Sequence, residues 1–320
     1  MRVAICMVTF RRTSLLQRAF AGVSRLKFCK VAAPEMEVIV VDNDPSRSAT
    51  CVCKRAVLPR PVRYVAESRR GIVHARNRAI AEASGSEFLA FLDDDEVPSE
   101  FWLDELLATQ ARFGADVVAG PTRPLYEPGL PEWIRRGSFF ERPSHETGTP
   151  LEFCASGNVL VRTKVFPRVG KFDDNFQLTG GEDTQFFLRV RRAGYKIVWS
   201  NEAVVWETVP RDRATLNWIV RRGYQSGNSW SLAEMSIETS LKYRALRFCK
   251  GSTHFIAGLA GAVIGLFLGR IAFAKNLRRA SLGAGMLAGL AGKKYLAYQY
   301  QCSGGPSVSG APGLRGRSSA

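Results

Sequence analysis

Four consecutive acidic residues, Asp93, Asp94, Asp95 and Glu96, follow an apolar run in the stretch "SEFLAFLDDDEVPSEFW". Adjacent like charges repel one another, and aspartate is unfavourable in the interior of strands and helices. We therefore expect a compensating positive charge nearby, from basic side chains, a helix N-terminus or a divalent cation. Carboxylates at a cleft suit Mg²⁺ or Mn²⁺, which take further ligands from phosphate and water. The alternative is a solvated acidic turn that caps the following helix.

Two other acidic sites could carry chemistry. Glu182 and Asp183 open a predicted helix in "GGEDTQFFLRVRRAGY", where a positioned carboxylate can accept a proton from a hydroxyl nucleophile. Simple helix capping would explain the same pair. Asp42 ends an apolar run in "MEVIVVDNDPS", where it is either a ligand contact or a turn-forming residue before Pro45.

Strands and helices alternate in the segments that must position these carboxylates. Short apolar runs predict buried strands, and helical spacing of apolar residues between them predicts helices. The expected strands cover residues 3–10, 36–46, 60–67 and 87–98, and the expected helices cover 13–26, 71–85 and 99–114. This pattern is typical of an α/β fold with a mainly parallel sheet. Ligands of such sheets bind beyond the carboxyl ends of the strands, which is where Asp42 and the acidic run lie.

The chain divides into three parts by composition. Residues 1–230 form the α/β domain, whose pattern changes at about residue 121. The second half begins with a proline-rich stretch that we expect to form long loops over the sheet. Residues 231–302 are a basic helical region, and residues 303–320 have the composition of a disordered tail.

Positive charge is concentrated in the C-terminal third. The formal net charge of the chain is +16, of which +13 lies in residues 211–320. Such a field attracts anionic partners, either nucleic acid or an acidic lipid surface. Between residues 242 and 294 the basic residues alternate with Gly/Ala/Leu patches and not with stacking aromatics, which favours lipid over nucleic acid. We therefore expect a membrane surface and no nucleic acid as the partner.

Two apolar stretches in this third predict contact with a membrane. Residues 253–269 approach the roughly 20 residues that span a bilayer, whereas residues 280–292 are too few. Because basic residues flank the first stretch on both sides, an interfacial or re-entrant helical pair is favoured over a single span. A packed helical subdomain is the alternative.

The N-terminus and the cysteines indicate the compartment. The N-terminal apolar run is too short for a signal peptide, and seven cysteines without metal-site spacing suggest free thiols in a reducing compartment. The expected location is the cytoplasmic face of the inner (plasma) membrane.

Six short motifs follow one another along the chain: "VTFRR", "VVDNDP", "GIVHARNRAI", "FLAFLDDDEVP", "SGNVLVR" and "GGEDTQFFLRVRRAGY". In this order and spacing they resemble the motifs of family 2 glycosyltransferases, which have the GT-A fold. The resemblance covers roughly residues 1–230 and is strongest to bacterial enzymes that build exopolysaccharide. It implies a Rossmann-like, mainly parallel sheet that binds a nucleotide diphospho-sugar. It also implies a nucleotide-binding half at about residues 1–120 and an acceptor half at about 121–230.

The resemblance also implies roles on the donor side. Asp42 would contact the nucleotide base in a pocket that Thr9 and Phe10 line. Arg76 would lie against the ribose or diphosphate, and Asp94 near the ribose.

The remaining implied roles concern the metal and the proton. Asp93 and Asp95 would form the DxD motif, with Asp95 as the ligand of a divalent cation, Mg²⁺ or Mn²⁺. Asp183 would be the general base, with Glu182 beside it.

Three more positions follow from the resemblance. Gly157 and Asn158 would border the acceptor site. In "VVWETVPRDR" this chain has Glu207 where many relatives have histidine, which leaves the role of that position open.

The implied reaction is inverting, metal-dependent transfer of a hexose from a nucleotide sugar, with a UDP-sugar favoured. The acceptor would be a lipid-linked oligosaccharide or polysaccharide in exopolysaccharide or cell-surface glycan synthesis. One alternative is transfer to polyprenyl phosphate. An alternative of another class is a non-catalytic binder of an anionic membrane surface or nucleic acid.

Overall fold

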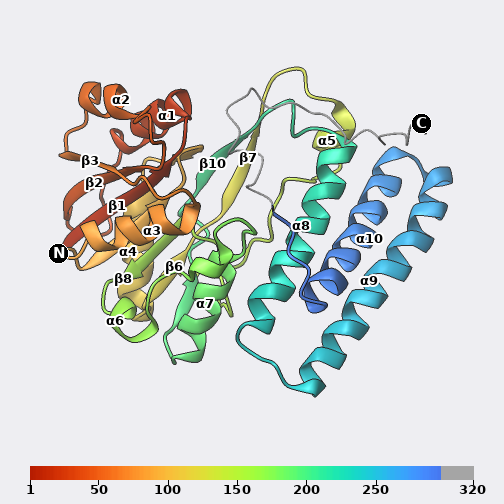
Figure 1. Cartoon of the computed structure of the whole chain (residues 1–320). Helices are drawn as coiled ribbons and strands as arrows, with labels where there is room; N and C mark the ends of the chain where they lie inside the picture. The colour runs from red at the N-terminus through yellow and green to blue at the C-terminus, as the bar shows by residue number, and fades with distance from the viewer. Residues whose placement is uncertain (297–320) are drawn as a thin grey trace, which may run out of the picture.

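The computed structural model describes residues 1–296 of the 320-residue chain. The predicted tail and the end of the predicted basic helical region lie outside the described residues. Figure 1 shows an α/β unit followed along the chain by a layer of long C-terminal helices.

A seven-stranded sheet forms the centre of the α/β unit, with strand order β3-β2-β1-β4-β8-β6-β9. Its strands are β1 (Arg2–Thr9), β2 (Glu35–Asp42), β3 (Val62–Ala66), β4 (Phe88–Leu92), β6 (Val117–Ala119), β8 (Asn158–Arg162) and β9 (Ile197–Trp199). β8 runs antiparallel to its neighbours β4 and β6, and the other pairings are parallel. The mainly parallel sheet expected from the sequence is confirmed.

Helices cover both faces of this sheet because its strands are apolar on both sides. Ile5 and Met7 of β1 belong to one hydrophobic core, and Ala4 and Cys6 belong to the other. The first core includes α1 (Thr13–Val23) and α4 (Trp102–Phe113), and the second includes α3 (Ile72–Glu82), α6 (Val165–Val169) and α7 (Glu182–Arg192). The alternation of side chains along each strand therefore gives the three-layer architecture.

The register of the parallel strands brings their carboxyl ends together. Thr9 at the end of β1 pairs with Asp42 at the end of β2, and β4 lies on the other side of β1. The loop that contains the acidic run leaves β4 at this edge. The sheet thus places the acidic run beside the end of β1.

A second, three-stranded sheet includes β7 (Thr122–Tyr126), from the proline-rich stretch that was expected to form loops, and β5 (Glu96–Pro98), the end of the strand expected at 87–98. It has the order β5-β10-β7, with β10 at Val205–Val209. β10 pairs antiparallel with β5, and this register sets Glu207 opposite Glu96. The proline-rich stretch also contains the short helix α5 (Glu132–Arg136). The small connecting elements are α2 (Thr50–Arg55) and the 3-10 helix η1 (Asp174–Phe176).

Three long helices complete the described chain: α8 (Leu216–Met235), α9 (Leu241–Leu268) and α10 (Arg270–Leu290). α10 packs against both α8 and α9, so that α9 is outermost (Figure 1). Glycines permit this close packing: a Cβ on Gly227 of α8 would collide with the carbonyl oxygen of Leu282 in α10. The domain boundary expected at residue 230 falls inside α8.

Candidate active site

The acidic run lies between the end of β1 and the small sheet, and arginines surround it. Thr9 Oγ1 donates a hydrogen bond of 2.7 Å to Asp94 Oδ2. Arg12 Nη1 lies 3.2 Å from both Asp94 Oδ1 and Asp95 Oδ2. Arg213 Nη2 lies 3.8 Å from Asp95 Oδ2. Basic side chains therefore supply part of the positive charge that the sequence led us to expect.

Despite these arginines, burial disfavours the ionised form of the carboxylic acids in this run. Burial and the neighbouring charge of Asp93 raise the pKa of Asp95 to about 6, although Arg12 opposes the change. Burial also raises the pKa of Asp94, and it raises that of Glu96 well above its usual value. The arginines do not offset the full cost of concentrating negative charge here, so an additional cation would be favoured.

Glycine at position 157 allows another segment to approach the acidic run closely. A Cβ there would lie 2.8 Å from Glu96 Oε1 and 2.9 Å from Asp93 Oδ2. Thr122 Oγ1 donates to the same oxygen of Glu96 at 3.0 Å. Gly157 is therefore in place beside the cluster.

The carboxylate oxygens of the acidic run supply part of the ligand set that a hard divalent cation needs. Within residues 1–296, no group of three or more His, Cys, Asp or Glu side chains is arranged to hold a metal ion. The side chain of Asp93 is 41% exposed and that of Asp95 is 13% exposed. Mg²⁺ is commonly held by one or two carboxylates plus phosphate oxygens and water. Asp93 and Asp95 fit that arrangement when a phosphate supplies the remaining ligands.

Arg76 joins the acidic run to the start of α7. Its Nη1 forms a close ion pair with Glu182 Oε1, and its Nη2 lies 3.4 Å from Asp93 Oδ1. Arg76 and Glu182 are both buried. Burial raises the pKa of Glu182, and Arg76 opposes that rise. The guanidinium group thus brings residues 93 and 182, which are far apart in sequence, into one network.

Asp183 differs from Glu182 in exposure. Glu182 is 4% exposed, whereas Asp183 is only partly buried. Asp183 Oδ1 accepts hydrogen bonds from the backbone N–H and the hydroxyl of Thr184 at 2.7 and 3.4 Å. Gly181, with φ of 88°, lets the chain turn into α7. Of the two carboxylates, Asp183 is therefore the one more open to a ligand.

Asp42 lies behind the loop that follows β2. Its side chain is fully buried, and its oxygens accept hydrogen bonds from the N–H groups of Asp44 and Ala49 and from the hydroxyl of Tyr64. It therefore holds the loop 43–49 as a turn residue. Phe10, next to Thr9, is partly exposed, and the Arg11 guanidinium lies 5.2 Å from its ring centre.

Asn158 is also engaged inside the protein. Its Oδ1 accepts from the indole N–H of Trp102 at 2.7 Å, and its Nδ2 donates to the carbonyls of Pro121 and Ala203 at 3.0 and 2.7 Å. Both amide hydrogens of Asn158 are already bonded to backbone carbonyls. Asn158 would therefore affect a bound acceptor substrate only by holding the segments around Pro121 and Ala203 in place.

Comparison with known proteins identifies the family. The family model described as "Glycosyl transferase family 2" matches residues 4–170. The chain belongs to this family. It is also 35% identical over 235 residues to the succinoglycan biosynthesis protein ExoM of Rhizobium meliloti, covering 71% of this chain and 72% of that protein. The glycosyltransferase AglE of Haloferax volcanii is 25% identical over 204 residues, which cover 63% of this chain and 65% of AglE.

Solved structures support the GT-A fold of this glycosyltransferase. The mannosyltransferase PcManGT from Pyrobaculum calidifontis, in complex with GDP-Man and Mn²⁺, superposes with a TM-score of 0.63 at 17% identity. The match covers 91% of this chain and 88% of PcManGT. S. aureus TarS 1–349 gives a TM-score of 0.51 at 15% identity, over 92% of this chain and 93% of that chain. The predicted fold and the assignment as a glycosyltransferase are confirmed.

Sequence reasoning did not single out three arginines of this glycosyltransferase that lie at or near the cluster. Arg12 follows the first strand directly, so its place at a strand end was a usable signal. Arg142 and Arg213 had no such signal, because they come from a proline-rich loop and from the segment before α8. Both form ion pairs with Glu207, at 2.9 and 3.1 Å.

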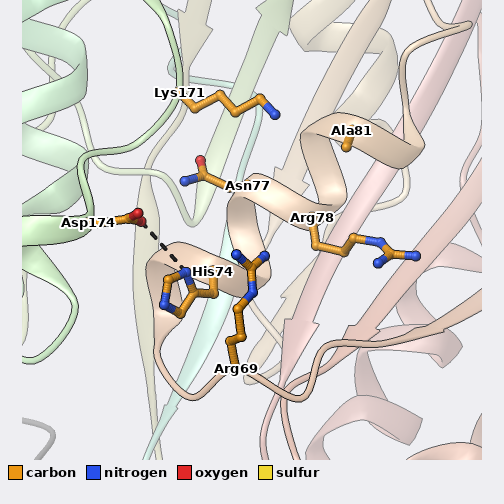
Figure 2. A pocket seen from close by; sticks show the side chains of 7 residues that line it. All are labelled: Arg69, His74, Asn77, Arg78, Ala81, Lys171 and Asp174. Carbon is orange, nitrogen blue, oxygen red and sulfur yellow. Dashed lines mark ion pairs between the residues drawn. The ribbon is translucent and has the colours of Figure 1, made fainter.

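A separate pocket of about 250 Å³ lies along α3 and the loop before η1 (Figure 2). Two of its arginines have acidic partners, Arg69 with Glu67 and Arg78 with Glu82, and the pocket also contains the carboxylate of Asp174, 3.6 Å from His74 Nδ1. This balance gives the pocket little attraction for an anion, and we assign it no part in the reaction.

The raised pKa of Asp95 predicts a pH-dependent effect on stability. A carboxylic acid whose pKa is higher in the folded than in the unfolded state stabilises the fold below its unfolded value of 3.8. That contribution disappears as the pH rises through about 6. Asp95→Asn should therefore make the metal-free protein more stable than wild type at pH 7.5, by on the order of 2–3 kcal/mol. The advantage should vanish below about pH 4.

Urea unfolding in chelator at a series of pH values measures this difference. Asp174→Asn, at a carboxylate whose side chain is 68% exposed, is the matched control and should stay close to wild type. An Asp95→Asn variant less stable than wild type at pH 7.5 would contradict the proposed electrostatic cost.

Proposed function

We propose that this glycosyltransferase moves a hexose from a nucleotide sugar, with a UDP-sugar favoured, to a lipid-linked oligosaccharide or polysaccharide acceptor with inversion at the anomeric carbon. One observation carries the proposal. Arg76 contacts both Asp93 in the acidic run and Glu182 beside Asp183. Arg76 therefore links the candidate donor site to the start of α7, where the candidate base Asp183 follows Glu182.

The proposed reaction is a single displacement. The acceptor hydroxyl attacks the anomeric carbon on the face opposite the diphosphate, and its proton passes to a carboxylate oxygen of Asp183. The bond from the anomeric carbon to the diphosphate oxygen breaks, and its electron pair leaves with the nucleoside diphosphate. Asp183 lies in the first turn of α7, which fixes the position of its carboxylate, and this positioning would supply most of its effect.

A divalent cation held by Asp95 and Asp93 would neutralise the leaving diphosphate as a Lewis acid. The chemistry of the acidic run supports this, as does the Mn²⁺ in the complex of PcManGT. Thr9 keeps Asp94 in place, and Asp94 would face the ribose. Phe10 would line the pocket for the nucleotide base. Asp42 would maintain the shape of that pocket by holding the loop 43–49. Gly157 would border the acceptor, and the similarity to the succinoglycan protein ExoM supports a glycan acceptor.

The base assignment predicts the effect of Asp183→Asn. Loss of a positioned base should lower kcat by about 10²–10⁴-fold with little change in donor affinity. Asp174→Asn, in η1 before α7, should keep near-normal turnover. Product anomers measured by NMR should show inversion. Near-normal turnover by Asp183→Asn would move the role to Glu182, which Glu182→Gln would test, and retention would exclude a single displacement.

The metal assignment predicts that chelator removes most turnover and that added Mg²⁺ or Mn²⁺ restores it. Asp95→Asn should fold normally yet gain almost nothing from the added cation, because it loses the main protein ligand. Activity with a panel of nucleotide sugars and lipid-linked acceptors measures both effects. Full turnover in excess chelator would show that the arginines suffice.

We also propose that α9 holds the enzyme at the cytoplasmic face of the membrane. Within residues 1–296, α9 is the one helix long and apolar enough to cross a bilayer, and most of its apolar stretch is exposed. Ile256, Val263 and Phe267 are 65%, 60% and 88% exposed. Lys242 and Lys250 are exposed near its start and could meet anionic headgroups.

The packing of α10 supports an interfacial position for α9. Arg270 at the start of α10 stacks on Trp133, 4.3 Å from its ring, and Arg278 donates to the carbonyl of Phe139 at 3.0 Å. Arg278 is thus partly buried against the catalytic domain, and Arg270, although exposed, also contacts that domain. α10 would have to leave α8 for a helical pair to enter the membrane. We therefore propose that α9 alone lies on the membrane surface.

This orientation predicts the effect of charge on the outer face of α9. Val263→Glu with Phe267→Glu should weaken binding to vesicles that contain anionic lipid by more than about tenfold, since each buried apolar side chain contributes about 1.5–3 kcal/mol. Turnover with a soluble acceptor should not change. The control is Leu125→Glu, at another exposed apolar residue on β7. Equal vesicle binding by the double variant and wild type in a sedimentation assay would exclude α9 as the contact.

A further inference from the structure

Glu207 is held between two arginines beside the acidic run. Arg142 Nη2 lies 2.9 Å from Glu207 Oε2, and Arg213 Nη1 lies 3.1 Å from Glu207 Oε1. Arg213 also reaches Asp95 Oδ2 at 3.8 Å through its other terminal nitrogen. The three residues come from β10, the loop before β8 and the segment before α8, so the tertiary fold alone assembles them.

On electrostatic grounds alone, Glu207 is unfavourable at this position. It is the register partner of Glu96, and its charge raises the pKa of both Asp95 and Glu96. A neutral side chain would avoid that repulsion. The geometry offers a reason for a carboxylate: it fixes two planar guanidinium groups, one against each of its oxygens.

These guanidinium groups keep donors available for a ligand. A guanidinium has five N–H donors, of which the contacts to Glu207 and Asp95 use only some. The side chains of Arg142 and Arg213 are 44% and 26% exposed. Arg76 is less available to a ligand, because it is buried and forms ion pairs with both Glu182 and Asp93.

We propose that Glu207 is a positioning residue that holds Arg142 and Arg213 to bind the diphosphate of the donor. The inference rests on the proposed function, since it assumes a nucleoside diphosphate donor at this cluster. The two arginines would bind phosphate oxygens directly and offset the charge of the departing nucleoside diphosphate. Glu207 would touch neither the sugar nor the phosphate.

Binding of nucleotides without turnover tests the two arginines. Titration calorimetry with UDP and UMP, and with GDP and GMP, first finds the base that binds wild type in MgCl₂. Arg142→Gln and Arg213→Gln should each weaken diphosphate binding by about tenfold, the usual size of a lost charged hydrogen bond. Monophosphate affinity should not change beyond error. Arg211→Gln is the matched control, because Arg211 is exposed and bonds to the carbonyl of Pro128.

A double-mutant cycle with Glu207→Gln tests positioning. If Glu207 holds Arg213 in place, the loss caused by Arg213→Gln should shrink when Glu207→Gln is already present. Equal losses in both backgrounds would overturn the positioning role. Wild-type diphosphate affinity in both arginine variants would overturn the whole inference and leave the proposed transferase activity standing. Failure of wild type to bind any of these nucleotides or to transfer any sugar would overturn both.

Discussion

Mutual repulsion among carboxylates at the end of β4 is the constraint on which the site depends. Asp93 to Glu96 lie together in partly buried surroundings, and burial together with the charge of Asp93 raises the pKa values of Asp94, Asp95 and Glu96. Such a cluster persists only if the rest of the fold stabilises it. The protein does so with arginines from segments that are distant in sequence. The same crowding leaves the cluster receptive to a further cation.

The two sheets meet this constraint in different ways. The large sheet aligns the ends of β1 and β4, which sets Thr9 and Arg12 against Asp94. The small sheet brings β10 against β5, and with it Glu207 and its arginines. A glycine at position 157 lets the loop before β8 pass beside Asp93 and Glu96 without a steric clash. The donor region is thus a joint product of both sheets.

The C-terminal helices attach an apolar surface to a charged catalytic domain. α10 provides the contact, through glycines that allow its backbone to approach α8 and α9 closely. Arg270 and Arg278 fasten α10 to the region around α5. α9 is then left with an apolar outer face that no described residue covers. The basic charge of this third of the chain is therefore divided between internal contacts and an exposed surface.

The sequence by itself determined the local elements and the family. Alternating apolar runs and helical spacing predicted β1, β2, β4 and the helices between them, because burial on both faces of a parallel sheet leaves a strong pattern. The order of short motifs was enough to predict a family 2 glycosyltransferase with a GT-A fold. It also pointed to the acidic run as the centre of the site.

Only the tertiary structure decided which charges meet. The proline-rich stretch carries no periodic pattern, so neither β7 nor the place of Arg142 could be predicted from it. Asp42 and Asn158 have the residue types of ligand contacts, yet the fold uses their hydrogen bonds internally. The basic residues on the two sides of the first apolar stretch also look alike in sequence. In the structure, Arg270 packs over the indole of Trp133, whereas Lys242 at the start of α9 is exposed. The reason is physical: apolar periodicity reports burial along one element, whereas ion pairs depend on the packing of elements that are far apart in the chain.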